Sequence, residues 1–248
     1  MSNSIMKLKL SQKSTVVYDV SPVLLVGGAE PGVMSLKYLE SFSGKIVAAD
    51  GGVRHILGRN KQPKAVIGDF DSLSACIQGA LPEEVLHPVS EQDSTDFEKC
   101  LTRIQAPLIL AMGFTGGRLD HELAVLHGLL AFPDRICVLI GSEDVLFLTP
   151  PEFQISLPPA TRYSLMPLLP VVVNSAGLRW PMGGAEFAPG HRIGTSNEVA
   201  EGEGDVLVTV SCDQPGLLTI LPREHLDAVI KSLLALPEGS GHWPARAR

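Results

Sequence analysis

Two aspartates separated by one residue are the strongest indication of chemistry in this sequence. The segment Gly68-Asp69-Phe70-Asp71-Ser72 follows Ala65-Val66-Ile67, an apolar run typical of the end of a buried strand. In an extended segment, side chains two residues apart point to the same side, and two such carboxylates repel each other unless a cation lies between them. Oxygen ligands in a loop suit Mg²⁺, which also binds water and phosphates. A polar turn with one aspartate capping the next helix is the alternative.

Two further acidic motifs stand downstream. Asp93 precedes a helical pattern over residues 94–104 and Asp96 lies in its first turn, so helix capping and a favourable dipole interaction compete with metal binding as explanations. Asp120 and His121 begin a helical pattern over residues 119–131, directly after Gly116-Gly117-Arg118. A guanidinium beside flexible backbone amides suits a polyphosphate. Together these motifs predict phosphoryl or pyrophosphoryl transfer assisted by a metal ion.

The elements that position these motifs alternate between strand and helix. This alternation predicts an α/β domain over residues 1–148, layered around a mostly parallel sheet. Ligands bind at the carboxyl ends of parallel strands, so the motifs that follow these strands should converge there. In the last helix we expect an apolar face of Leu119, Leu123, Leu126 and Leu130. The predicted strands are 23–26, 46–49, 65–68, 107–111, 135–140 and 145–148, and the predicted helices are 33–42, 53–59, 94–104 and 119–131.

A change of character at Thr149-Pro150-Pro151 predicts a second domain over residues 149–236. Short apolar runs separated by proline and glycine are typical of a small all-β sandwich. Helical spacing returns over residues 223–236 and predicts a C-terminal helix, after which residues 237–248 form a tail that we expect to be disordered. Alternating residues over 7–20 predict a hairpin or an edge strand at the N-terminus.

Composition excludes several classes of protein. The 248 residues carry a formal net charge of −7 without a basic run, which argues against nucleic-acid binding. There is no signal-peptide pattern and no apolar run of the ~20 residues that a membrane span requires. The four cysteines are widely spaced, which disfavours a zinc site or a disulfide framework and agrees with reduced thiols in a cytoplasmic protein.

Four motifs in this order resemble thiamine pyrophosphokinases. They are Asp50-Gly51-Gly52, Gly68-Asp69-Phe70-Asp71-Ser72, Gln92-Asp93-Ser94-Thr95-Asp96-Phe97 and Gly116-Gly117-Arg118-Leu119-Asp120-His121. Downstream, Ser196-Asn197 and the segment Gly177-Leu178-Arg179-Trp180 are similar to C-terminal elements of the family, so the resemblance extends from about residue 23 to residue 221.

The resemblance implies an enzyme that transfers the β,γ-diphosphoryl group of ATP to the hydroxyl of thiamine, giving thiamine diphosphate and AMP. It implies a requirement for Mg²⁺, and a homodimer with the active site between subunits. The implied metal ligands are Asp69, Asp71, Asp93 and Asp96, of which Asp71, Asp93 and Asp96 are also the catalytic residues. The implied ATP contacts are Asp50, Gly51, Gly52, Ser72, Gln92, Thr95, Gly116, Gly117, Arg118, Asp120 and His121, and the implied thiamine contacts are Ser196 and Asn197. The proton acceptor is left open between Asp71 and Asp93.

Two other functions compete with this assignment. Asp69-Phe70-Asp71-Ser72 also resembles the Asp-x-Asp-x-Thr motif of haloacid dehalogenases, which would make the chain a Mg²⁺-dependent phosphohydrolase. A non-catalytic thiamine or nucleotide sensor would keep the pocket without turnover. The sequence departs from the family at Val125, in a region where an asparagine is often found. Trp180 could stack on the substrate ring, but a position in the core is the expectation that we favour.

Overall fold

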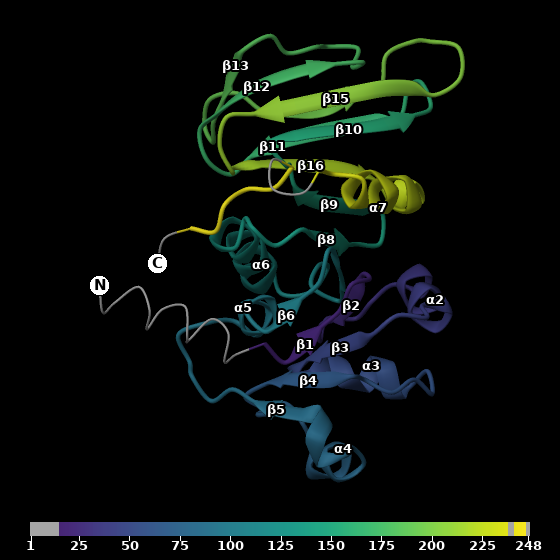
Figure 1. Cartoon of the computed structure of the whole chain (residues 1–248), viewed down its shortest axis with the longest axis vertical. Helices are drawn as coiled ribbons and strands as arrows, with labels where there is room; N and C mark the ends of the chain where they lie inside the picture. Colours follow the sequence, from purple (N-terminus) through teal and green to yellow (C-terminus); the bar gives the residue numbers. More distant parts are fainter. Residues whose placement is uncertain (1–14, 238–240, 247–248) are drawn as a thin grey trace. The chain divides into compact units, whose positions relative to one another are not determined.

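The computed structural model describes residues 15–237 and 241–246, which divide into two compact units at Gly128/Leu129 (Figure 1). The predicted N-terminal hairpin lies largely outside the described residues. Its described part contains a short strand, β1 (Val17–Tyr18), which pairs in parallel with β6 (Ile104–Gln105). No helix in the described ranges is long and apolar enough to cross a membrane.

The first unit is built on five parallel strands. Their order across the sheet is β7 (Ile109–Met112), β2 (Val23–Val26), β3 (Ile46–Ala49), β4 (Ala65–Gly68) and β5 (Leu86–Pro88). Every residue of β7, β2, β3 and β4 is buried. Strands covered on both faces are apolar throughout, which is why these segments are continuous apolar runs in the sequence. The predicted α/β class is confirmed.

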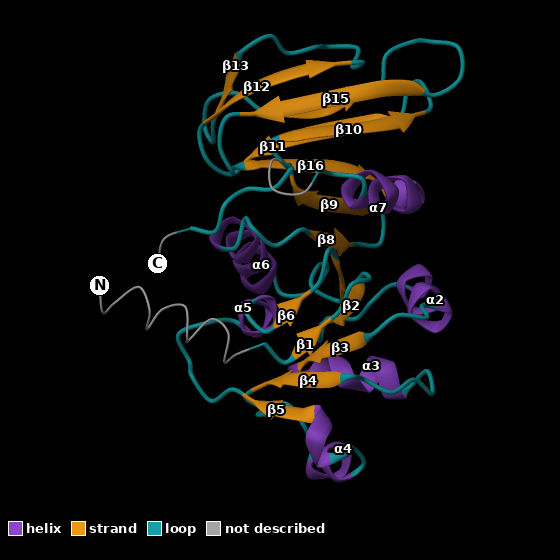
Figure 2. Cartoon of the chain, viewed as in Figure 1, coloured by secondary structure: helices purple, strands orange, loops and turns teal. Residues whose placement is uncertain are grey.

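The helices of this unit connect the strands, as Figure 2 shows. Among them, α3 packs on β3, and α5 packs on β4 and β3. A 3₁₀ turn, η1, carries Asp50-Gly51-Gly52 directly from β3 into α3. The helices are α2 (Val33–Ser41), α3 (Val53–Leu57), α4 (Ala75–Gly79), α5 (Asp96–Leu101) and α6 (Leu119–Ala131).

The start of α5 corrects one expectation. The N-cap is Thr95 and not Asp93: the Thr95 hydroxyl accepts the N–H of Glu98 at 3.3 Å, and the Glu98 carboxylate accepts the N–H of Thr95 at 3.0 Å. This capping box satisfies two backbone donors at once, so it fixes the helix start more firmly than a single aspartate would. The helix is also shorter than predicted, because Ile104 belongs to β6.

The buried face of α6 is a second correction. Leu119 and Leu123 are 68% and 56% exposed, whereas Val125 and Leu129 are buried. This helix carries apolar residues on more than one side, so their period alone does not identify the packed side. Close packing selects it: a Cβ on Gly128 would lie 2.8 Å from the ring of Phe97 on α5.

The second unit contains two antiparallel sheets (Figure 2). The ring centroid of Phe147 on the first sheet lies 5.0 Å from that of Phe153 on the second, so this aromatic pair joins the two sheets. The predicted sandwich is confirmed. The first sheet has the order β14 (Gly194–Glu198), β11 (Arg162–Pro167), β16 (Leu217–Pro222), β9 (Asp144–Leu148) and β8 (Cys137–Ile140), and the second has the order β10 (Glu152–Leu157), β15 (Val206–Cys212), β12 (Val171–Ala176) and β13 (Ala185–Phe187).

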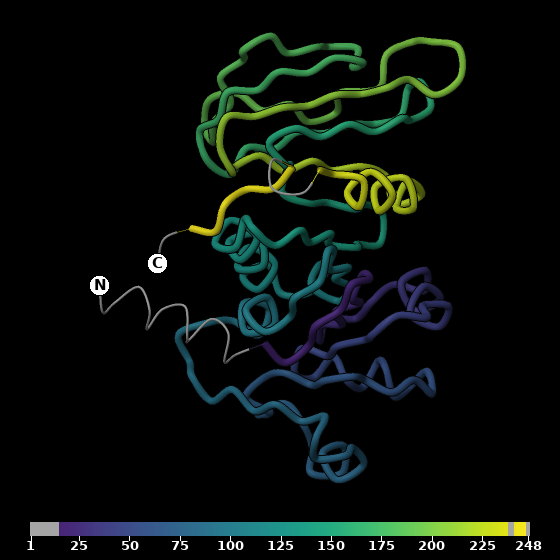
Figure 3. Tube along the Cα trace, viewed as in Figure 1, coloured from purple at the N-terminus to yellow at the C-terminus, as the bar shows by residue number. Residues whose placement is uncertain are grey.

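The last described residues form a helix and a short extension, drawn in yellow in Figure 3. The predicted C-terminal helix is a 3₁₀ turn, η3 (Arg223–His225), followed by α7 (Leu226–Leu234). Of the expected disordered tail, residues 238–240 and 247–248 lie outside the described residues. Within the described part, the indole N–H of Trp243 donates to the Thr149 carbonyl at 2.8 Å.

Candidate functional site

Three carboxylates of the first unit converge at the ends of neighbouring strands. One carboxylate oxygen from each of Asp50, Asp69 and Asp71 lies within 4.8 Å of the others. Asp50 follows β3 and Asp69 follows β4, and these strands pair in parallel with Ala49 opposite Ile67. Parallel pairing therefore brings together two motifs that lie 19 positions apart in the sequence. Three oxygen donors at this spacing are suited to a divalent cation.

The loop that carries Asp69 and Asp71 is not extended, contrary to the expectation from sequence. Phe70 has a φ of +65° and Asp50 a φ of +42°, both in the left-handed region. Asp50 is buried, and its Oδ1 accepts the Phe70 N–H at 3.1 Å while its Oδ2 accepts the hydroxyl of Ser72. Asp50 thus holds the turn that brings Asp69 and Asp71 together. Left-handed backbone at residues other than glycine is strained, and such strain is concentrated at functional sites.

Close backbone packing explains why glycine accompanies these aspartates. A Cβ on Gly68 would lie 2.8 Å from the Cβ of Asp50, and a Cβ on Gly52 would lie 2.1 Å from the carbonyl oxygen of Val26. A side chain at either position would push apart the strand ends that form the acidic cluster.

A buried lysine that the sequence analysis did not single out joins two of the predicted aspartates. The Nζ of Lys99 lies 2.9 Å from Asp69 Oδ2 and 3.2 Å from Asp96 Oδ1, and its side chain is only 2% exposed. Lys99 is on α5, which packs against β4 and so brings the amine to Asp69. The sequence could have pointed to Lys99, because it stands three residues after Asp96 and directly before the apolar residues Cys100 and Leu101. Both of these residues are buried in the structure.

Charges in this cluster shift several pKa values. The hydrogen bond from Lys99 lowers the pKa of Asp69, while the negative charge of Asp69 raises the pKa of Asp71. Burial raises the pKa of Asp96, against the opposing hydrogen bond from Lys99. For Lys99 itself, burial acts against the charged form, but the hydrogen bonds to Asp69 and Asp96 prevail and its pKa is raised. Asp71 therefore carries repulsion that a cation would relieve.

The remaining residues of the second acidic motif are placed differently. The Gln92 amide lies 3.5 Å from Asp69 Oδ2, at the edge of the cluster. Asp93 is exposed, and its backbone N–H donates to Glu91 at 3.0 Å. Thr95 is occupied as the cap of α5. The structure thus brings Gln92 and Asp96 to Asp69, and it shows no contact of Asp93 with the cluster among the described residues.

The glycine-rich loop after β7 presents an exposed ion pair. Arg118 donates to both oxygens of Asp120, at 3.1 and 2.6 Å, and this hydrogen bonding lowers the pKa of Asp120 to about 2. The backbone N–H of His121 also donates to Asp120, at 3.0 Å, and the N–H of Gly116 donates to Glu122 at 3.1 Å. Gly116 has a φ of +78°, which glycine adopts without strain. Gly117 completes this loop, and the residues 116–121 are exposed, although Glu122 and Asp120 accept the hydrogen bonds of Gly116, Arg118 and His121.

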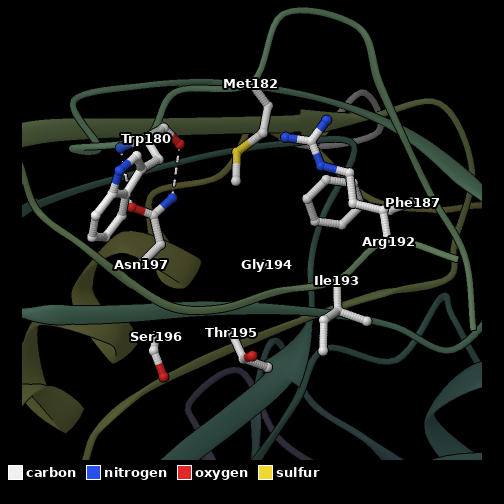
Figure 4. A pocket seen from close by; sticks show the side chains of 9 residues that line it. All are labelled: Trp180, Met182, Phe187, Arg192, Ile193, Gly194, Thr195, Ser196 and Asn197. Atoms are coloured by element: carbon white, nitrogen blue, oxygen red, sulfur yellow. Dashed lines mark hydrogen bonds between the residues drawn. The ribbon is translucent and has the colours of Figure 1, made fainter.

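The second unit contains a pocket of about 320 Å³ beside β14. Ser196 has a φ of +60°, and its backbone N–H donates to the Ser164 hydroxyl at 3.0 Å, while its side chain is exposed. Figure 4 shows the side chains from several segments around this space. The lining residues are Trp180, Met182, Phe187, Arg192, Ile193, Gly194, Thr195, Ser196 and Asn197.

Asn197 is turned toward the main chain of Trp180, as the dashed lines in Figure 4 show. Its Oδ1 accepts the Trp180 N–H at 3.2 Å, and its Nδ2 donates to the Trp180 carbonyl at 2.8 Å. The same Oδ1 accepts the Glu198 N–H at 2.9 Å, and the residue is 4% exposed. The amide of Asn197 is therefore committed largely to holding Trp180.

Trp180 is not a core residue, contrary to expectation. It is 54% exposed because it lies in the segment before β13, at the pocket edge, and not in a strand of the sandwich. The guanidinium of Arg179 lies 5.0 Å from its ring centroid and is ion-paired with Glu198. The indole is thus supported from its backbone and on its ring, which suits a fixed wall for an aromatic ligand.

Comparisons with known proteins agree over both units. The family model described as "Thiamin pyrophosphokinase, catalytic domain" matches residues 36–140, and "Thiamin pyrophosphokinase, vitamin B1 binding domain" matches residues 152–217. The chain is 30% identical to thiamine pyrophosphokinase 1 of Arabidopsis thaliana over 185 residues, which cover 64% of this chain and 69% of that protein. It is 30% identical to thiamin pyrophosphokinase 1 of Caenorhabditis elegans over 173 residues, covering 62% and 70%.

Solved structures show the same fold. The thiamin pyrophosphokinase of Geobacillus thermodenitrificans superimposes with a TM-score of 0.68 at 25% identity, over 81% of this chain and 97% of that chain. The enzyme of Candida albicans also gives a TM-score of 0.68, at 18% identity, over 83% and 92%. The second likeness supports the fold alone.

Proposed function

The chain belongs to the thiamine pyrophosphokinase family, and on this premise we propose that it transfers the β,γ-diphosphoryl group of ATP to the hydroxyl of thiamine, giving thiamine diphosphate and AMP. The observation that carries the proposal is the convergence of Asp50, Asp69 and Asp71 at the strand ends of the α/β unit. Phosphoryl transfer requires mainly positioning and charge stabilisation, and such a cluster supplies both when a cation binds.

We propose Mg²⁺ as that cation. The donor set fits: it consists of carboxylate oxygens alone, and the pKa of Asp71 is raised by the neighbouring charge of Asp69. Asp69 and Asp71 would hold the ion, which would supply positive charge against the negative charge that develops on the transferred phosphates. Asp96, tied to Asp69 through Lys99, and the exposed Asp93 stay predicted members of the ligand set and of the catalytic residues.

The glycine-rich segments and Arg118 are proposed to bind the ATP phosphates. Asp50 has a positioning role in this scheme, because it fixes the turn at Phe70 and the hydroxyl of Ser72. Arg118 would exchange its exposed partner Asp120 for a phosphate, a change in which a charge-assisted hydrogen bond replaces another of the same kind. The other proposed ATP contacts are Gly51, Gly52, Ser72, Gln92, Thr95, Gly116, Gly117, Asp120 and His121.

The pocket beside β14 is proposed to bind thiamine. Its wall of Trp180, Met182 and Phe187 suits an aromatic ring, and Ser196 offers a polar contact. Asn197 would then act on the ligand chiefly through Trp180. We also propose that two copies of the chain assemble, with residues of both subunits completing one active site, and that the enzyme works in the cytoplasm.

The test is to incubate the purified protein with ATP, Mg²⁺ and thiamine and to analyse nucleotides and thiamine products together. We expect AMP and thiamine diphosphate in equal amounts, and no AMP when thiamine is omitted. Phosphate release without thiamine would indicate the phosphohydrolase instead. Thiamine binding without any turnover would indicate the sensor.

A further inference from the structure

Lys99 is a buried cation inside the acidic site. Its side chain is 2% exposed, so the ammonium has lost nearly all of its contact with water. Burying a charged amine is costly unless ionised partners surround it, and here Asp69 and Asp96 are those partners. Packing alone does not require a lysine, because the neighbouring buried positions on α5 are occupied by Phe97, Cys100 and Leu101.

The lysine distinguishes the two oxygens of each carboxylate. Oδ2 of Asp69 receives the amine at 2.9 Å, while Oδ1 is on the side of Asp71, whose backbone N–H lies 3.4 Å away. Likewise Oδ1 of Asp96 receives the amine at 3.2 Å. Each carboxylate is thereby left with one oxygen that the ammonium does not occupy.

We propose that Lys99 is a positioning residue that determines which divalent cation the site accepts, by restricting Asp69 to a single metal-binding oxygen. The inference rests on the proposed function, because it takes the cluster to be a metal site. Mg²⁺ uses a near-ideal octahedron of single oxygens, whereas Ca²⁺ takes six to eight oxygens and accepts a carboxylate through both. An Asp69 that cannot bind through both oxygens favours Mg²⁺ over Ca²⁺.

The test compares two affinities, so that the effect of removing the lysine's charge can be distinguished from the effect of freeing an oxygen of Asp69. The affinities for Mg²⁺ and Ca²⁺ are measured without nucleotide, for the full-length protein and for Lys99→Met. Each ion displaces bound Mn²⁺, and electron paramagnetic resonance detects the released Mn²⁺. Loss of the positive charge strengthens the binding of both ions alike, so it leaves their ratio unchanged. Freeing Oδ2 of Asp69 strengthens Ca²⁺ specifically, and we expect the preference for Mg²⁺ over Ca²⁺ to fall by about 10-fold or more.

Two further variants make the result specific. Lys99→Gln keeps a hydrogen-bond donor for Asp69 Oδ2 without the charge, and should keep the ion preference while both affinities rise. Lys45→Met removes another lysine that is ion-paired, at 3.2 Å from Asp19, and should change neither affinity. If Lys99→Met does not fold, the ratio is measured in Lys99→Ala, which also frees Oδ2 of Asp69 and leaves every proposed ligand in place.

An unchanged ion preference in the folded methionine variant would overturn the proposal, as would a wild-type protein that binds no divalent cation without nucleotide. Turnover of ATP and thiamine is measured separately. A protein that shows the predicted change in ion preference but makes no thiamine diphosphate would refute the proposed function and leave the role of Lys99 standing.

Discussion

The side chain of Asn197 brackets the main chain of Trp180, with Oδ1 3.2 Å from its nitrogen and Nδ2 2.8 Å from its carbonyl oxygen. A side-chain amide can occupy a donor and an acceptor of one residue in this way only at close range and in one orientation. Removing it takes away both side-chain partners of the Trp180 N–H and carbonyl, each bond being worth about 0.5–1.5 kcal/mol in this partly buried place. The position of the indole at the pocket edge therefore depends on Asn197.

We expect Asn197→Ala to raise the KM for thiamine by about 10-fold, while the KM for ATP stays unchanged, because the amide supports only the pocket wall. Steady-state kinetics with each substrate varied in turn measures this separation. The fluorescence of Trp180, one of two tryptophans in the chain, should also lose its response to thiamine. Asn174→Ala is the matched control, since Asn174 accepts the Gly184 N–H at 2.8 Å and does not line the pocket. Equal effects of the two substitutions would contradict the assignment.

Asp71→Asn should lower kcat by about 100-fold or more while the protein stays folded, because one metal-binding carboxylate is lost. The measurement is turnover of the purified variant together with its circular dichroism and its Mn²⁺ affinity. Near-normal turnover in the folded variant would remove Asp71 from the metal site.

The same variant makes a prediction about stability and pH. Because the charge of Asp69 raises the pKa of Asp71 in the folded protein, the folded state binds this proton more tightly than the unfolded state does. The ionised carboxylate therefore destabilises the fold above that raised pKa, and the penalty fades as the pH falls through it. Without metal, Asp71→Asn should melt at or above the melting temperature of the wild type at pH 7. The difference between the two melting temperatures should shrink as the pH is lowered towards the pKa of Asp71 in the unfolded state. The quantity to compare is the melting temperature of the variant minus that of the wild type. If this difference were smaller at pH 7 than at low pH, the result would argue against repulsion at this site.

Arg118→Ala should raise the KM for ATP by about 10-fold and leave the KM for thiamine unchanged, since a guanidinium that binds phosphate is replaced by a methyl group. Initial rates at fixed thiamine measure the effect. Arg59→Ala removes another ion-paired arginine of the same unit, 2.9 Å from Glu40, and should not change ATP use. An unchanged ATP dependence in Arg118→Ala would count against its placement at the phosphates.

Gly52→Ala should destabilise the protein by about 3 kcal/mol, because its Cβ would lie 2.1 Å from the backbone oxygen of Val26, where neither atom can move freely. Gly28→Ala is the control. There the nearest atom to a new Cβ is 3.9 Å away, and we expect a change within about 0.5 kcal/mol. Urea unfolding of the two variants measures both values, and similar losses would show that the close contact at Gly52 is relieved by movement of the backbone.

Local patterns were sufficient for much of the fold. Apolar runs ending in acidic or glycine-rich motifs predicted the positions of β2, β3 and β4, because buried parallel strands are apolar on both faces and their ends bind ligands. Among the strands that were not predicted are β6, β13 and β14. The residues of β14, Gly194-Thr195-Ser196-Asn197-Glu198, contain no apolar side chain that a period of two could reveal.

By itself, the sequence determined the order of the motifs, the two kinds of domain and the family, since each depends on residue types and short spacings. The tertiary structure decided the partners: Lys99 bonds Asp69 from 30 positions away, and Asn197 holds Trp180 from 17 positions away. Tertiary packing also determined which side of α6 is buried, because Val125 is buried and Leu123 is exposed. The physical reason is that the φ and ψ preferences and periodicity of a segment are local, whereas a hydrogen bond or a close packing contact forms only when the fold has brought two distant segments together.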